Sequence, residues 1–244
     1  MDQRMGFIVA HEAGDESVAA LCRHFGISRK TGHVWPVLAG AFREYGLPRR
    51  LRSDNRPPFA STETAGLSRF AVTLIKAGVM PERIAPGQPQ QNGRHEPLYP
   101  TLKQDTASPP AHSLAAQIER FERFRDIYNN ERPHEALGQV APARCYQPSP
   151  RRFDGVLRSP EYASKVSVPR VRPCGAIKWQ GNEIFISQAL RGEPVGLFAI
   201  ADGVWLVKYR PIVLGTMNGT EGFIRVAPAT QKRPASKRNK PPNL

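Results

Sequence analysis

The chain contains two short stretches in its first half that decide the fold: LRSDN at residues 51–55 and PGQPQQNGRHE at residues 86–96. The first predicts a short strand, Leu51–Ser53, that ends directly before a carboxylate, Asp54. An acid at the carboxyl end of a strand is well placed to reach a site above a sheet. The second stretch ends in another acid, Glu96. Most surface carboxylates only face solvent, so the neighbouring sequence decides how these two are interpreted.

Two further blocks follow, TLK at residues 101–103 and YNNERPHEAL at residues 128–137. Together and in this order, the four blocks resemble the integrase-core transposases of bacterial insertion sequences. Those proteins are similar to retroviral integrases and have an RNase H-like catalytic domain. The resemblance covers about residues 37–150.

The resemblance implies a known kind of chemistry. Three carboxylates, in the order Asp, Asp, Glu, hold two Mg²⁺ (or Mn²⁺) ions that clamp the scissile phosphate of DNA. By resemblance, Asp54 is the second of these acids and Glu96 is the third. The same carry-over places three more side chains near the DNA: Asn92, Arg94 and Lys103.

The chain departs from this family where the first acid should lie. A helical pattern ends at Trp35 and the next begins at Val37, which leaves no room for the first three strands of an RNase H-like sheet. None of the upstream acids falls on a strand candidate; these are Asp2, Glu12, Asp15, Glu16 and Glu44. We therefore expect an internal deletion with its join near Pro36, and a catalytic defect.

A helix-turn-helix pattern occupies the N-terminal region. Apolar residues at helical spacing run to Phe25, Gly26 stops the helix, and Ser28 can cap a short second helix, Arg29–Trp35. That second helix exposes side chains suited to phosphates and base edges: Arg29, Lys30, Thr31 and His33. The alternative interpretation is an ordinary helical hairpin.

Further helices are predicted over residues 3–13, Val37–Tyr45, Leu67–Ala77 and Leu114–Tyr128, with one strand near Arg83–Ala85. The apolar residues of the 114–128 helix are expected to lie in the core.

The apolar period changes to two after residue 175, which is typical of strands. Five short strands separated by turn signals suggest a small antiparallel barrel of the SH3-like type. The predicted strands are Ala176–Trp179, Glu183–Ser187, Val195–Ile200, Val204–Tyr209 and Ile212–Met217.

The predicted fold class is therefore α+β and multidomain. A helix-turn-helix segment occupies residues 1–35, and a truncated RNase H-like α/β core occupies residues 36–150. A basic, proline-containing linker (151–175) leads to the small β-barrel (176–226), and a basic disordered tail (227–244) follows.

The charge balance favours a nucleic-acid partner. The net charge is +14 over 244 residues, and most of it lies in the linker and the tail, which carry +4 and +5. Such segments contact polyphosphates well, although a solubilising role is an equal alternative.

Other features of composition bear on location. The cysteines are odd in number and far apart (Cys22, Cys145 and Cys174), which argues against a disulfide framework and fits a reducing cytoplasm. Neither a signal-peptide pattern nor a run of 18 apolar residues is present, so we expect a bacterial cytoplasmic, nucleoid-associated protein with no membrane contact.

Two interpretations of function follow. The first is a transposase for DNA integration, acting by metal-dependent phosphodiester cleavage and strand transfer, that is catalytically defective because the first Asp is missing. The second is a non-catalytic DNA-binding protein or a decayed transposase remnant. In either case the expected partners are double-stranded DNA and a second chain, which is either another copy or an intact transposase.

Overall fold

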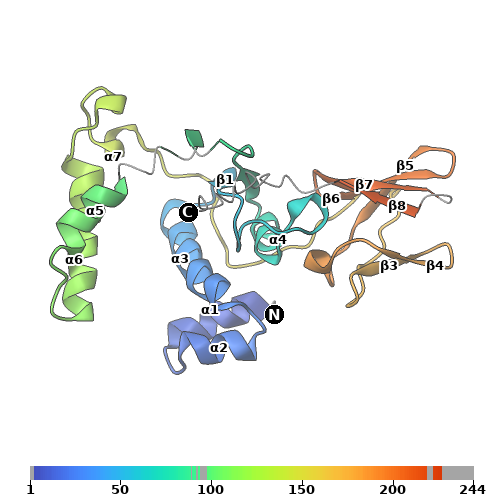
Figure 1. Ribbon diagram of the computed structural model, residues 1–244, viewed down its shortest axis with the longest axis horizontal. Coiled ribbons are helices and arrows are strands. Elements are labelled where there is room, and N and C mark those ends of the chain that lie inside the picture. Colours follow the sequence, from blue (N-terminus) through green and yellow to red (C-terminus); the bar gives the residue numbers. More distant parts are fainter. Residues whose placement is uncertain (1–2, 89, 92, 94–97, 219–221, 227–244) are drawn as a thin grey trace, which may run out of the picture.

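The computed structural model describes residues 3–88, 90–91, 93, 98–218 and 222–226. Its helices are α1 Gln3–Ala13, α2 Val18–His24, α3 Arg29–Tyr45, α4 Arg69–Lys76, α5 Leu98–Ala107, α6 Leu114–Asp126 and α7 Pro142–Cys145 (Figure 1). Its strands are β1 Arg50–Ser53, β2 Met80–Arg83, β3 Ala176–Trp179, β4 Asn182–Phe185, β5 Gly196–Ala201, β6 Val204–Tyr209, β7 Ile212–Asn218 and β8 Gly222–Arg225. Shorter helical turns are η1 Thr64–Gly66, η3 Ile127–Glu131, η4 Glu135–Leu137 and η5 Gln188–Leu190. Over the described residues, no helix combines the length and apolar character that crossing a bilayer requires.

Helices α1 to α3 form a small helical unit at the N-terminal end. Phe7, Leu21 and Cys22 are its buried cluster. The turn between α2 and α3 contains Gly26, at φ +60°, and ends at the N-cap Ser28, whose Oγ accepts a hydrogen bond from the Thr31 N–H at 3.2 Å. The predicted succession of helix, glycine-containing turn and capped helix is therefore present.

The predicted helix break at Pro36 is wrong. Helix α3 continues through Pro36 to Tyr45, although an interior proline removes a hydrogen bond and costs about 3 kcal/mol. Three buried side chains on the two sides of the proline, Trp35, Ala39 and Phe42, share one apolar cluster with residues of α4. Tertiary packing of this face overrides the local break.

A strand–helix–strand unit follows α3. Strands β1 and β2 are parallel, with Arg50 opposite Met80 and Ser53 opposite Arg83, and α4 connects them. The first predicted strand is confirmed, but the second begins three residues before its predicted position. Pro81, which cannot donate to a ladder, hid this strand from sequence patterns.

Helix α4 is buried on both sides. Phe70 and Leu74 belong to the cluster that contains Trp35 of α3. Val72 and Ile75 belong to a second cluster, which is shared with the C-terminal strands. All residues of α4 after Arg69 are buried, so this helix belongs both to the core that contains α3 and to the core of the C-terminal strands.

The C-terminal strands form two antiparallel sheets within the described residues, a β3–β4 hairpin and a β5–β6–β7–β8 meander. All five predicted strands are present. β3 and β6 have the predicted bounds, whereas β4, β5 and β7 have shifted ends; β4, for example, ends at Phe185 instead of Ser187. Strand β8 was not predicted. Trp179 and Trp205 pack edge to face, 5.5 Å apart, against the core that both sheets share.

The segment 151–175 has neither helix nor strand, as expected of a linker, but it is not simply solvated. Phe153, Leu157 and Val171 are buried. The Arg158 N–H donates to the Lys76 carbonyl at 3.1 Å, which fixes the segment beside α4. Scattered apolar residues without a period gave no sign of this packing.

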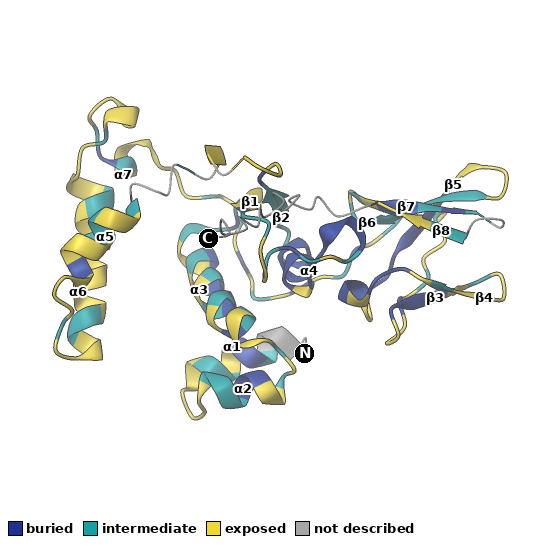
Figure 2. Ribbon diagram, in the orientation of Figure 1, coloured by how far each residue is buried: buried dark blue, intermediate teal, exposed yellow. Residues whose placement is uncertain are grey.

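The prediction of a buried 114–128 helix is also wrong. Leu114, Ile118 and Phe121 are 77%, 52% and 42% exposed, and α6 has no buried residue. Helices α5 and α6 form an arm beside the rest of the molecule (Figures 1 and 2). Among the described residues, no element packs across the apolar face of α6. The periodic spacing of its apolar residues therefore marks a face that is exposed to solvent.

One buried ion pair joins α4 to the C-terminal unit. Lys76 Nζ lies 2.9 Å from Glu193 Oε1, and the side chains are 8% and 10% exposed. The Ser159 and Tyr209 hydroxyls donate to Glu193 Oε2 at 2.9 and 3.2 Å. Burial raises the pKa of Tyr209, and the carboxylate of Glu193 raises it further, so the phenol keeps the proton that it donates.

Removing one member of this pair should destabilise the protein strongly. In Lys76→Met, the Glu193 carboxylate stays buried without its cation, and we expect a loss of about 3–5 kcal/mol in the free energy of unfolding. The double variant Lys76→Met/Glu193→Leu should lose clearly less. Urea unfolding followed by tryptophan fluorescence measures both.

The matched control is Glu183→Gln, which breaks the Arg172–Glu183 pair at 3.0 Å, with both side chains 54% exposed. Its expected cost is at most about 1 kcal/mol. Equal losses in Lys76→Met and Glu183→Gln would contradict the role given to the buried pair.

Candidate nucleic-acid interface and catalytic carboxylates

Asp54 lies half-buried directly after β1, as its position in the sequence predicts. Its Oδ1 accepts a hydrogen bond from the Arg56 N–H at 3.3 Å, and the Ser53 hydroxyl donates to its carbonyl at 3.1 Å. Oδ2 has no hydrogen-bond partner among the described residues. The carboxylate is therefore held at the strand end with one oxygen open to a ligand.

Asn55 fixes the loop that carries Asp54. Its Nδ2 donates to the Ile84 carbonyl at 2.9 Å, just beyond β2. Its Oδ1 is buried and has no partner within the described part of the chain. This amide ties the loop after β1 to the end of the neighbouring strand.

The described residues do not supply a complete magnesium site. No group of three or more His, Cys, Asp or Glu residues that could hold a metal is found among them. Glu82, a carboxylate on the neighbouring strand, is held by Arg52 at 2.6 Å. A two-metal centre needs several carboxylate oxygens, and among residues 50–56 and 80–83, which include β1 and β2, only Asp54 offers a carboxylate without an ion pair. The predicted acid Glu96 lies outside the described residues, as do Asn92 and Arg94.

Three of the four side chains that the sequence predicts for DNA contact are free on α3. Arg29, Lys30 and His33 are exposed and have no hydrogen bond or ion pair with another described residue. Thr31 is half-buried, and its hydroxyl lies 2.9 Å from Ser28 Oγ in the helix cap. The first turns of α3 therefore present two exposed cations and one histidine.

Lys103 does not join this group. It is exposed on α5, in the arm formed with α6 (Figure 1). The structure thus separates Lys103 from α3 and from the strand that positions Asp54.

A groove of about 770 Å³ connects the start of α3 with the loop after Asp54. Ser28 and Thr31 line it from α3, Asn55 lines it from the loop, and Arg69 and Arg191 line it from α4 and the C-terminal unit. These residues are far apart in the sequence, so sequence patterns gave no sign of the groove. A basic groove that runs from a helix start to the loop after a strand-end carboxylate suits an extended polyanion.

The cations of this groove differ in their roles. Arg83 donates from Nη2 to the Ala65 carbonyl at 2.7 Å, and burial lowers the pKa of its guanidinium. A Cβ on Gly66, which has φ +67°, would lie 1.9 Å from Arg83 Nη1, so this glycine is needed for the close approach. Arg191 is exposed and has no partner among the described residues. Arg83 therefore supports the groove wall, while Arg191 is free to bind.

Residues 77–142 match the model of the integrase core domain family. The match begins at the end of α4 and covers β2, α5 and α6; Glu96 lies within it, and Asp54 lies before it. The finding supports an integrase-core, transposase-like protein. It confirms the resemblance over three of the four sequence blocks, 86–96, 101–103 and 128–137, whereas the block at 51–55 lies outside the match. An RNase H-like core, which the resemblance implies, is consistent with the match.

Replacing Arg83 and Arg191 separately should distinguish a side chain that stabilises the groove wall from one that is available to bind a ligand. Arg83→Met leaves the Ala65 carbonyl of η1 without its donor, and we expect a loss of about 1–3 kcal/mol in unfolding free energy. Arg191→Met should change stability by less than about 0.5 kcal/mol, because the side chain is exposed. Urea unfolding of both variants makes the comparison, and equal stabilities would refute the assignment of Arg83 to the groove wall.

Proposed function

We propose that the protein binds double-stranded DNA as a descendant of integrase-core transposases and does not carry out strand transfer. The observation that carries this proposal is the basic groove between the start of α3 and the loop after Asp54. DNA bound by α3 would continue along this groove toward the carboxylate.

The N-terminal unit supports the DNA-binding part of the proposal. We interpret α2, the Gly26 turn and α3 as a helix-turn-helix in which α3 enters the major groove. Arg29 and Lys30 lie in the first turn of α3, where recognition helices contact phosphates and base edges. The +14 net charge adds long-range attraction to DNA.

The C-terminal unit extends the same surface. We interpret β3–β8 as a small SH3-like barrel, because its two sheets share one core. Arg191, which follows η5 of this unit, contributes a free cation to the groove. A nucleoid-associated location follows from the proposed partner.

The proposed catalytic defect rests on the number of carboxylates available to bind Mg²⁺. β1 is the first strand within residues 3–53, and the acids before it lie on helices or turns; Glu12 is on α1 and Glu44 is on α3. No described acid before Asp54 is therefore on a strand beside it. With Asp54 and Glu96 as the two remaining family acids, a pair of Mg²⁺ ions at the spacing of in-line displacement lacks ligands.

A second chain belongs to the proposed function as well. The exposed face of α6 at Leu114, Ile118 and Phe121 favours a state in which the protein acts with another copy or interferes with an intact transposase.

The DNA-binding proposal predicts a change in salt dependence. In the double variant Arg29→Ala/Lys30→Ala, the slope of log K against log salt should fall by about 2, since each phosphate contact contributes about 0.9. Fluorescence anisotropy with a labelled duplex measures the slope. Arg123→Ala is the matched control, because Arg123 is an exposed cation on the α6 arm; its slope should not change. An unchanged slope in the double variant would rule out α3 as a phosphate-binding helix.

The catalytic part is tested by nicking of supercoiled plasmid in Mn²⁺. We expect the wild-type protein and Asp54→Asn to give the same background, because the metal ligands are incomplete. Both samples are first shown to be folded by circular dichroism. Nicking by the wild-type protein that disappears in Asp54→Asn would overturn the proposed defect.

A further inference from the structure

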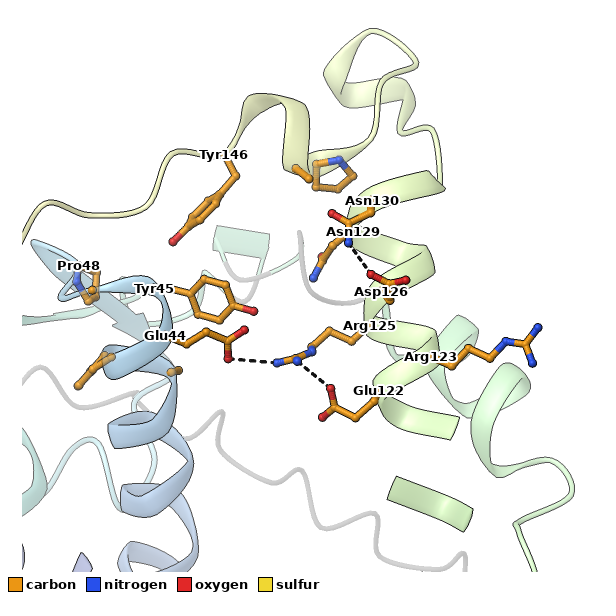
Figure 3. Close-up of a pocket in the computed structure, with 15 residues that line it drawn as sticks. Glu44, Tyr45, Pro48, Glu122, Arg123, Arg125, Asp126, Asn129, Asn130 and Tyr146 are labelled. Atoms are coloured by element: carbon orange, nitrogen blue, oxygen red, sulfur yellow. Dashed lines mark hydrogen bonds and ion pairs between the residues drawn. The ribbon is translucent and has the colours of Figure 1, made fainter. Parts of the chain in front are cut away.

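A cleft of about 930 Å³ lies between the C-terminal end of α3 and the arm helix α6 (Figure 3). It is distinct from the groove beside Asp54, because the two share no lining residue. The proposed function leaves this cleft unused.

Tyrosine and proline side chains form one wall of the cleft. The rings of Tyr45 and Tyr146 meet edge to face with centroids 5.9 Å apart, and both project into the space in Figure 3. Pro48 and Pro142 also line the cleft. Grooves lined by aromatic rings bind proline-containing segments well, since the pyrrolidine ring packs on a flat face and the segment loses little entropy.

Carboxylates form the other wall. Arg125 lies between Glu44, at 3.4 Å, and Glu122, at 2.7 Å, so one cation faces two anions. Asp126 adds a third carboxylate, which accepts a hydrogen bond from Asn130 at 2.6 Å, while Arg123 points away from α3 (Figure 3). A hydrogen bond to Glu44 raises the pKa of Tyr45, and burial adds to the effect, as expected beside an anion. The cleft is therefore locally acidic in a protein of net charge +14.

The chain itself contains a segment of matching chemistry. Residues 227–244 hold five Lys and Arg residues, no acid and four prolines. They lie outside the described residues and follow Val226, whose carbonyl accepts a hydrogen bond from the Ala65 N–H at 3.0 Å beside η1. An extended segment of this length reaches about 60 Å, more than twice the length of α3, which is about 26 Å.

We propose that residues 227–244 bind in the cleft between α3 and α6 of the same chain. The prolines pack on Tyr45 and Tyr146, and the lysine and arginine side chains pair with Glu44, Glu122 and Asp126. Charge selects this occupant, since a polyanion such as DNA is repelled by the same carboxylates. Docking of the tail holds the most basic segment of the protein against the protein instead of against DNA.

Zero-length carbodiimide cross-linking of the full-length protein, read by mass spectrometry, tests the proposal. We expect amide links from Lys232, Lys237 or Lys240 to the cleft acids, and we expect them to weaken between about 50 and 500 mM salt as screening grows. Glu119, an exposed acid on α6 that does not line the cleft, is the internal control and should not be linked.

Two variants separate the aromatic wall from nonspecific attraction. Tyr146→Ala should reduce the yield of these links about threefold to tenfold, the loss expected for one aromatic contact. Tyr99→Ala removes an exposed ring on α5 outside the cleft and should leave the yield unchanged. Both tyrosines are at least half exposed, so both variants keep the fold, which circular dichroism verifies.

A mixture of ¹⁵N-labelled and unlabelled protein distinguishes the sources of the tail. Links within one isotopic form support the proposal. Mixed-isotope links would place the tail of a second copy in the cleft and overturn it. Links spread over acids outside the cleft, links to Glu119 in equal yield, or no tail links at all would overturn it as well.

Discussion

Helix α4 is the element on which the rest of the structure depends. A helix that is buried on both sides contributes stability only when both covers are present, and here the two covers come from opposite ends of the chain. The Lys76–Glu193 pair adds a constraint, because either charge alone in that site is costly. The C-terminal unit is therefore an integral part of the core, since one face of α4 packs against it.

The sequence predicted elements whose signals are local. Strand β1 and its terminal Asp54 were predicted from the short LRSDN block, and the C-terminal strands were predicted because turn residues separate them. Two predictions that depended on tertiary packing were wrong. Pro36 does not break α3, since buried neighbours hold the helix, and the apolar face of α6 is exposed, since periodicity reveals a face but not its cover. The groove was unpredictable for the same reason, because its lining residues meet only in the fold.

The internal deletion that the sequence predicts would explain both the exposed arm and the small parallel sheet. Parallel sheets are normally larger and covered by helices on both faces, whereas β1 and β2 form a pair without further strands in the described residues. Helices α5 and α6 belong to the segment that matches the integrase core, yet α6 covers none of this sheet with its apolar face. When the sheet beside α5 and α6 is incomplete, the apolar face of α6 has no strands to pack against. With the deletion that the sequence predicts, the exposure of α6 and the absence of a metal-ligand group among the described residues would both follow from the same missing strands.

The distribution of charge links the two surfaces proposed to bind partners. The groove beyond Asp54 is lined by three arginines, and the cleft beside Tyr45 is lined by three carboxylates, so we expect a DNA duplex and a basic tail to bind in different places. If residues 227–244 dock as proposed, their five cations are unavailable to DNA, and each cation released from the cleft adds a possible phosphate contact. A long duplex offers many phosphates and competes for the tail, whereas a short one does not. The affinity of the protein for DNA would therefore rise with duplex length more steeply than the footprint of α3 and its groove alone requires.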